Sequence, residues 1–299
     1  MEKTLILTYD KNAYFYPFVK NKNISIEEPI KKKNIINKIF FRIPILSTLS
    51  YGFLPILDEI DKIIIFDSVY NFALGFYLKK IKKIEKVYLY CWNPINKMHP
   101  RIGKIKIALA KKMMKIFSFD HNDCKEFDLY YAPMVYSKNV AQFFDKEEIR
   151  YDLFFMGGKK DRYELLKKIY NTYFKGKYKS NIILVGEEEN NRDFTFSKET
   201  YGYSEYLRYV SQSKAILDIP QVGQEGLTIR NVESIFLKKK LLTTKRDIIK
   251  YDFYNSNNIF ILGKDDSNRL AEFFSSKYED IDEQIKDNYE IEKWIKLIK

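Results

Sequence analysis

Short apolar runs alternate with stretches of helical spacing along nearly the whole chain. Short unbroken apolar runs are typical of buried strands, and apolar positions three or four residues apart are typical of helices packed on one face. In the first half we predict strands at residues 5–8, 62–66, 86–91, 115–119 and 130–133. In the second half we predict a strand that starts at Tyr151 and runs into a Gly-Gly turn, and further strands at residues 181–185, 215–219, 240–243 and 258–262. This alternation favours an α/β fold with parallel sheets.

One polar segment divides this pattern into two halves. Residues 138–151 are charged and polar, and we interpret them as a linker. The last segment, residues 281–299, has apolar residues at helical spacing and predicts a terminal helix. A chain of 299 residues is long enough for two domains of ordinary size.

The most informative segment lies around residue 225. The run from Lys214 to Pro220 predicts a short buried strand that the proline stops. Apolar residues at helical spacing predict a helix that begins near Thr228. The loop between strand and helix contains Glu225 and Gly226. Because the start of a helix presents unpaired N–H groups and a partial positive charge, this segment is suited to binding a phosphate.

A second carboxylate lies further along the same helix. Gly226 allows the backbone to approach a ligand closely. Glu233 lies roughly 7–8 Å beyond Thr228 along the helix axis, at about 1.5 Å per residue. A ligand with its diphosphate at the helix start would therefore place a sugar near Glu225 and a ribose near Glu233. The spacing predicts a nucleotide-sugar site.

The loop and helix together read Glu225-Gly226-Leu227-Thr228-Ile229-Arg230-Asn231-Val232-Glu233. This run resembles the Glu-x7-Glu motif of glycosyltransferases with the GT-B fold. The resemblance implies that Glu225 faces the donor sugar and that Glu233 binds the nucleotide ribose. We also predict donor contacts from Gly226, Leu227, Thr228 and Arg230. Arg230 is a candidate phosphate ligand because a cation in the first turn of a helix opposes the helix dipole unless an anion binds there. The chain has Thr228 where the family usually has glycine, and Arg230 where proline is usual.

The resemblance implies an arrangement for the whole chain. In the GT-B fold two Rossmann-like domains face each other across a cleft, and the C-terminal helix returns to the first domain. Residues 1–145 would then bind the acceptor, residues 151–280 would bind the nucleotide-sugar donor, and residues 281–299 would form the crossover helix. The chain resembles bacterial glycosyltransferases of lipopolysaccharide, lipooligosaccharide or capsule assembly, which implies a glycan or lipid-linked glycan acceptor and chemistry without a metal or other cofactor.

Basic residues follow the first strand of the second half. Gly157, Gly158 and Lys159 lie at its carboxyl end, where open α/β sheets bind ligands, and Arg162 follows. Cations here would stabilise a leaving nucleoside diphosphate as it gains charge. The resemblance agrees with this role, and a tight turn with exposed cations is the alternative. Tyr206 is a candidate for flanking the nucleotide base, with ordinary packing as its alternative.

Carboxylates at strand ends in the first half are candidates for activating an acceptor hydroxyl. An inverting mechanism needs a general base, whereas a retaining mechanism can proceed without one. Our candidates for the base are Asp120 and His121, and Asp10 and Asp67 also qualify by position. The alternative for His121 is an ordinary surface histidine. The two cysteines and two histidines indicate neither a disulfide framework nor a zinc site.

The net charge of +12 predicts an acidic partner. Residues 97–115 are densely basic, and residues 101–115 among them predict an amphipathic helix that would lie on anionic lipid, with a solvated face as the alternative. No nucleic-acid-binding motif accompanies the charge, so we expect no nucleic-acid partner. The N-terminus does not have the form of a signal peptide, and no stretch resembles a spanning helix. We therefore expect a cytoplasmic protein, at most peripheral at the inner face of the membrane.

Two other functions compete with the glycosyltransferase interpretation. One is a non-catalytic two-domain α/β protein that binds a glycan or a nucleotide. The other is a nicotinamide-dependent oxidoreductase, which is disfavoured because no G-x-G-x-x-G turn follows the first strand.

Overall fold

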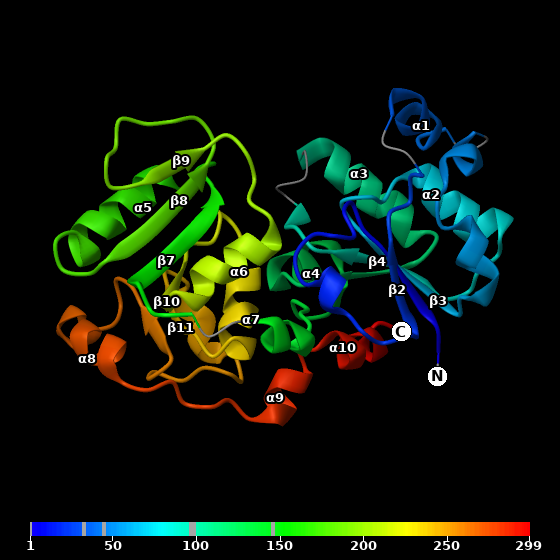
Figure 1. The fold of residues 1–299 in the computed structure, drawn as a ribbon. Coiled ribbons are helices and arrows are strands. Elements are labelled where there is room, and N and C mark those ends of the chain that lie inside the picture. The colour runs from blue at the N-terminus through cyan, green and yellow to red at the C-terminus, as the bar shows by residue number, and fades with distance from the viewer. Residues whose placement is uncertain (1, 32–33, 44–45, 96–99, 145–146) are drawn as a thin grey trace. The chain divides into compact units, whose positions relative to one another are not determined.

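The computed structural model describes residues 2–31, 34–43, 46–95, 100–144 and 147–299 (Figure 1). The chain divides into two compact units. Unit 1 comprises Met1–Ser137 and Ile291–Lys299, and unit 2 comprises Lys138–Glu290. Each unit is an α/β body built on a six-stranded parallel sheet, as the alternation of apolar runs predicts.

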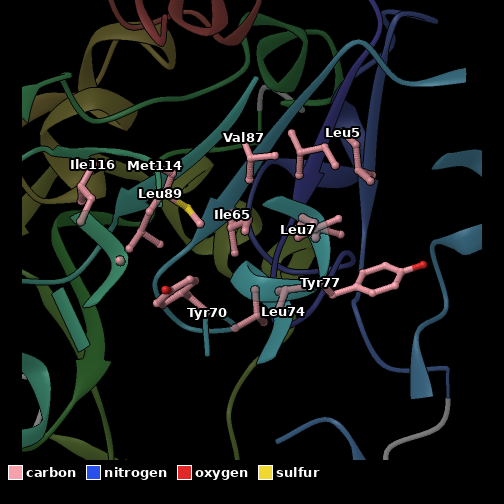
Figure 2. Packing of buried hydrophobic residues seen from close by; sticks show 14 of the residues in the cluster. Leu5, Leu7, Ile65, Tyr70, Leu74, Tyr77, Val87, Leu89, Met114 and Ile116 are labelled. Atoms are coloured by element: carbon pink, nitrogen blue, oxygen red, sulfur yellow. The ribbon is translucent and has the colours of Figure 1, made fainter. Parts of the chain in front are cut away.

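The sheet of unit 1 has the strand order β2-β1-β3-β4-β5-β6. Its strands are β1 Thr4–Leu7, β2 Ile24–Glu27, β3 Lys62–Phe66, β4 Val87–Cys91, β5 Lys115–Ser118 and β6 Tyr130–Tyr131. Its helices are α1 Ile35–Phe40, α2 Phe72–Phe76, α3 Pro100–Lys111, α4 His121–Phe127 and α10 Ile291–Leu297. Figure 2 shows strand side chains such as Leu7 and Ile65 beside Leu74 and Tyr77, which come from the helical segment after β3. This packing explains why β1 and β3 are apolar after their first residues, Thr4 and Lys62.

The C-terminal segment completes unit 1. The Trp294 side chain is fully buried, and its Nε1–H donates to the Pro133 carbonyl oxygen at 2.9 Å. Its ring lies edge-on to Tyr90, with 4.7 Å between the ring centroids. Lys62 Nζ donates to the Ile295 carbonyl oxygen at 3.0 Å. Residues from the end of the chain are therefore part of the first core.

The sheet of unit 2 has the strand order β12-β11-β10-β7-β8-β9. Its strands are β7 Tyr151–Gly158, β8 Ser180–Val185, β9 Thr195–Ser197, β10 Ser213–Asp218, β11 Lys240–Thr243 and β12 Ile259–Ile261. Its helices are α5 Tyr163–Ile169, α6 Tyr203–Ser211, α7 Ile229–Phe236, α8 Leu270–Ser275 and α9 Glu283–Asp287. Because β10 pairs with β7, the loops that follow these two strands lie at the same sheet edge.

The predicted single helix over residues 281–299 is wrong. The structure has α9 and α10 instead, with a break at residues 288–290. The Tyr289 hydroxyl donates to Asp252 in unit 2 at 2.8 Å, whereas the Ile291 N–H donates to the Tyr136 carbonyl oxygen in unit 1 at 2.9 Å. The apolar residues that predicted one helix therefore belong to two different cores.

Parts of two other predicted segments lie outside the described residues. These are residues 97–99 of the basic segment 97–115 and residues 145–146 of the linker. The rest of the linker contains a 3-10 turn at Lys138–Phe143. Within the described part of the chain, no helix is both long enough and apolar enough to cross a bilayer.

Candidate functional site

A buried carboxylate fixes the start of α7 at the strand ends of unit 2. Asp218, the last residue of β10, is fully buried. Its carboxylate accepts hydrogen bonds from Thr228 Oγ1 at 2.7 Å, Asn231 Nδ2 at 3.0 Å and Thr243 Oγ1 at 3.0 Å. The Thr228 N–H in turn donates to Asn231 Oδ1 at 2.8 Å. Thr228 is thus the N-cap of α7, with its hydroxyl donated to Asp218.

Two arginines meet beside the end of β7. Both guanidinium groups lie over the Phe155 ring, Arg162 at 6.0 Å and Arg230 at 5.0 Å from its centroid. Arg230 also donates to the Met156 carbonyl oxygen. Gly157 makes room for the pair, because a Cβ at this position would lie 2.7 Å from Arg230 Nη2 and 3.3 Å from Arg162 Nη1. The structure therefore brings Gly157, Arg162 and Arg230 together, as the sequence predicts for a phosphate site.

The electrostatics of this pair favour an anion. Arg162 is only 6% exposed, and burial together with the nearby Arg230 charge lowers its pKa to about 10. Its Nε is buried without a hydrogen-bond partner among the described residues. Within the same part of the chain, neither guanidinium forms an ion pair with a carboxylate. Two like charges held close in a poorly solvated place are stabilised by a bound anion, and guanidinium groups suit the oxygens of phosphate.

Glu233 lies in the same helix and is almost completely buried. Its exposed fraction is 1%. Oε1 accepts from the Tyr203 hydroxyl at 2.7 Å, and Oε2 accepts from the Tyr206 hydroxyl at 2.6 Å. Burial raises the pKa of the Glu233 carboxyl, against the opposing effect of these two hydrogen bonds. Tyr206 is predicted from the sequence and Tyr203 is not, although a spacing of three on one helix places both side chains on one face.

The contacts of Lys159 and Glu225 differ from those of the two arginines. Lys159 forms an ion pair with Glu189, and its ammonium also donates to the Glu187 carbonyl oxygen at 3.3 Å. The Glu225 side chain is exposed, while its carbonyl oxygen accepts from Lys245 Nζ. Lys245, which sequence reasoning missed, also forms an ion pair with Asp247 at 2.9 Å.

Two other residues of the Glu-x7-Glu run, which follow Glu225, lie inside unit 2. Gly226 and Leu227 are buried, and Leu227 is only 1% exposed. Gly158, the other predicted glycine, is half-buried, and a Cβ there would come no closer than 3.4 Å to the Lys160 side chain. Gly158 therefore has more space around it than Gly157.

The carboxylates predicted as bases in unit 1 have structural partners. Asp120 is the N-cap of α4, and its Oδ1 accepts from the N–H groups of Asn122 at 2.9 Å and Asp123 at 3.3 Å. His121 is exposed and stacks on Tyr131, with 4.1 Å between the ring centroids. Their part in acceptor activation stays a prediction.

Asp67, which also qualified by its position at a strand end, is buried. It accepts from the Trp92 N–H at 2.8 Å and from Asn93 Nδ2 at 3.1 Å. Burial raises the pKa of this carboxyl. Both of its oxygens thus accept hydrogen bonds from the segment that follows β4.

Unit 1 has a pocket of about 450 Å³ that the sequence does not reveal. It lies beyond the carboxyl ends of β1, β2 and β3, and its lining includes Glu28, Tyr70 and three cationic side chains, which are Lys38, Arg42 and Lys106. The Lys106 ammonium donates to the Asp67 carbonyl oxygen at 3.0 Å. Among the described residues, no three or more His, Cys, Asp or Glu side chains cluster as metal ligands would.

No model of a known protein family matches the sequence, and no curated protein matches it. Several solved structures are similar in fold. An α-glucosyltransferase in complex with UDP and a 13-mer DNA containing an A:G mismatch has a TM-score of 0.53 at 13% identity, over 95% of this chain and 89% of that one. The lipopolysaccharide outer core galactosyltransferase WaaB has a TM-score of 0.51 at 10% identity, over 99% and 98%. Sucrose-phosphate synthase from Thermosynechococcus elongatus has a TM-score of 0.52 at 6% identity, over 100% and 96%.

These similarities extend over nearly the full length of both chains. They agree with the two parallel six-stranded sheets and show that the chain has the GT-B fold.

Proposed function

We propose that the protein is a glycosyltransferase that uses a nucleotide-sugar donor bound by unit 2. The observation that carries this proposal is the pair formed by Arg162 and Arg230, held over Phe155 at the end of β7. This pair lies at the carboxyl edge of a parallel sheet, where ligands of open α/β folds bind. Its charge and burial suit a diphosphate.

Each side chain of the site has a part in this proposal. The diphosphate of the donor lies against the two guanidiniums and the start of α7, which together stabilise the leaving group as charge develops on it. Glu225 positions the donor sugar from the exposed loop. Glu233 accepts hydrogen bonds from the ribose hydroxyls, since an ionised carboxylate can accept about four and the two tyrosines provide two. The arginines take the place that a metal ion has in other enzymes.

We propose a bacterial surface glycan as the acceptor, of the lipopolysaccharide, lipooligosaccharide or capsule type. The likeness of the Glu225–Glu233 run to the motif of such enzymes supports this class, and WaaB, one of the similar structures, is named as an outer core galactosyltransferase. Asp120 and His121 stay the candidate bases for an inverting reaction. NMR of the anomeric proton in the product decides between inversion and retention.

A nucleotide screen tests the donor site. The full chain is melted in the presence of UDP, GDP, CMP, ADP and dTDP, because a ligand that binds the folded state raises its stability by RT ln(1 + [L]/Kd). One nucleotide is expected to raise the melting temperature of the wild type and to lose this effect in Arg162→Ala and Arg230→Ala. Arg269→Ala, an exposed position in unit 2, is the matched control and should respond like the wild type.

The same screen separates the competing functions. No shift with any nucleotide would contradict the donor site. Nucleotide binding without donor hydrolysis or transfer to any glycan would favour the non-catalytic binding protein. Because one similar structure holds DNA, duplex DNA is included as an acceptor, and transfer to it would replace the glycan in this proposal.

A further inference from the structure

Helix α1 carries apolar side chains that the fold leaves uncovered. Four of its six residues are isoleucine or phenylalanine, and none of the six is buried. Ile35 is 77% exposed, Ile36 60% and Ile39 53%, and Ile43 just beyond the helix is 40% exposed. These four isoleucines, together with the exposed cations Lys31, Lys38 and Arg42, are called the α1 surface below. Apolar side chains gathered in this way mark an interaction site.

The isoleucines are held outward by contacts on the other side of α1. Phe41 at its C-terminal end is buried in the core of unit 1, where its ring lies 6.0 Å from that of Tyr51. Asn71 Nδ2 donates to the Phe41 carbonyl oxygen at 3.1 Å. Figure 1 shows α1 at the margin of unit 1, away from its sheet. The contacts of Phe41 therefore hold α1 with its isoleucines exposed.

The charged residues of the segment that carries these isoleucines have one sign. Residues 31–57 contain five lysine or arginine residues and no aspartate or glutamate. Among the described residues, Lys31, Lys38 and Arg42 form no ion pair with a carboxylate. Isoleucines that enter the acyl boundary, with cations at the level of anionic headgroups, match an anionic bilayer. A two-fold contact between copies would instead bring these cations together, because such a contact uses the same patch on both subunits.

Helix α3, the basic helix predicted from the sequence, fits a bilayer less well. It exposes Ile105 at 61%. Two of its lysines are engaged by carboxylates, Lys104 by Glu126 at 3.1 Å and Lys111 by Asp128 at 3.0 Å. A paired lysine attracts anionic lipid less than an unpaired one, so the observations favour α1 over α3.

We propose that unit 1 docks on an anionic phospholipid bilayer through the α1 surface. Lys38, Phe41 and Arg42 also line the pocket of unit 1, so the pocket opens beside the docking surface. If the protein is the proposed glycosyltransferase, its acceptor is a glycan anchored in that bilayer. Lys38, Arg42 and Lys106 then bind an anionic group of this acceptor.

Vesicle flotation of the full chain tests the docking. Vesicles of pure phosphatidylcholine are compared with vesicles that contain a quarter of phosphatidylglycerol. We expect the wild type to float only with the anionic vesicles, and less so at high salt. The triple variant Ile35→Ser, Ile36→Ser, Ile39→Ser should remain at the bottom. The double variant Lys38→Glu, Arg42→Glu should lower the partition coefficient at least on the order of 25-fold, at roughly fivefold for each cation.

Matched controls distinguish the possible failures. The variant Ile105→Ser on α3 should float like the wild type, and the melting temperature of each variant shows that it is folded. Absence of binding to anionic vesicles, or binding that the α1 variants leave intact, would overturn the docking. So would a dimer in solution that the triple isoleucine variant dissociates. The nucleotide screen measures ligand binding by unit 2, and flotation measures bilayer binding by unit 1. Either proposal can therefore be contradicted without the other.

Discussion

Arginine at position 230 has a specific partner in the structure. The related motif usually has proline there, and proline has no side chain that could reach β7. Here the guanidinium crosses to the Met156 carbonyl oxygen and lies beside Arg162 over the same ring. The departure from the family pattern thus adds a cation where the proposed diphosphate binds.

Gly157→Ala should separate nucleotide binding from folding. The added methyl group would lie 2.7 Å from Arg230 Nη2, so the arginine has to move while the backbone can stay. We expect nucleotide affinity to fall about tenfold, which corresponds to roughly 1.4 kcal/mol. Isothermal titration of the nucleotide found in the screen measures this. Gly158→Ala meets only ordinary contacts from 3.4 Å and should bind as the wild type does. Equal losses in both variants would exclude this explanation.

Asp123 should make the stability of unit 1 depend on pH. Its carboxylate accepts from the Ile95 N–H at 2.9 Å, and burial raises its pKa to about 6. A raised carboxyl pKa stabilises the folded state at low pH, and this contribution is lost as the pH rises through about 6. The loss amounts to at most about 3 kcal/mol, because each tenfold change in proton affinity corresponds to about 1.4 kcal/mol.

The variant Asp123→Asn removes this titration. Its unfolding free energy relative to the wild type should therefore increase between pH 4 and pH 7. Urea unfolding followed by tryptophan fluorescence at both pH values measures the difference. A constant difference would mean that the carboxyl titrates near its ordinary pKa in the folded state.

At the scale of the element, α7 depends on the buried carboxylate of Asp218. Three side chains from α7 and β11 donate to it, and it fixes both the start of the helix and the loop before it. The exposed Glu225 lies in this loop, and the buried Glu233 lies in this helix. A helix of eight residues would be marginal on its own, so its position must come from such contacts.

We expect Asp218→Ala to destabilise unit 2 by about 3 kcal/mol or more, because three buried donors lose their acceptor. Urea unfolding followed by far-UV circular dichroism measures this effect. Asp193→Ala, in the same unit, removes a partly exposed carboxylate whose partner Lys175 is also exposed, and it should change stability by less than about 1 kcal/mol. If the two variants lose similar stability, the network around Asp218 does not anchor α7.

Most strands were predictable from the sequence, including the edge strands β6 and β12, but two other edge strands were not. Continuous apolar runs located β3 and β11 to the residue. The edge strands β2 and β9 were missed, because they are short and mostly half-buried, so their apolar pattern is weak. The sequence assigned Arg162 and Arg230 to the same diphosphate, but it did not reveal that both lie over the Phe155 ring. This arrangement depends on the pairing of β10 with β7, which chain order does not reveal.

At the scale of the whole molecule, the chain crosses from unit 2 back to unit 1 at Ile291. Both tryptophans of the protein, Trp92 and Trp294, belong to unit 1. Tryptophan fluorescence therefore follows the unfolding of unit 1, while nucleotide binding reports on unit 2. The two units can be tested separately in one sample.

Trp294→Ala should destabilise unit 1 by about 3–5 kcal/mol, because a fully buried indole is lost. The fluorescence of Trp92 during urea unfolding measures this loss. Nucleotide affinity at low urea should be unchanged, since all residues of the proposed donor site belong to unit 2. A matching loss of nucleotide affinity would show that the units do not fold separately.

The discontinuity of unit 1 also sets an order for biosynthesis. On the ribosome, residues 138–290 emerge as one continuous stretch, and unit 2 has its complete sequence before the last residues are made. Synthesis of unit 1 starts first, but its core is completed last, because Trp294 packs beside Tyr90 and Pro133 only after unit 2 has been made. Until Trp294 has emerged, the nascent first domain exposes an apolar face that the folded protein covers, so we expect chaperones to bind it during synthesis.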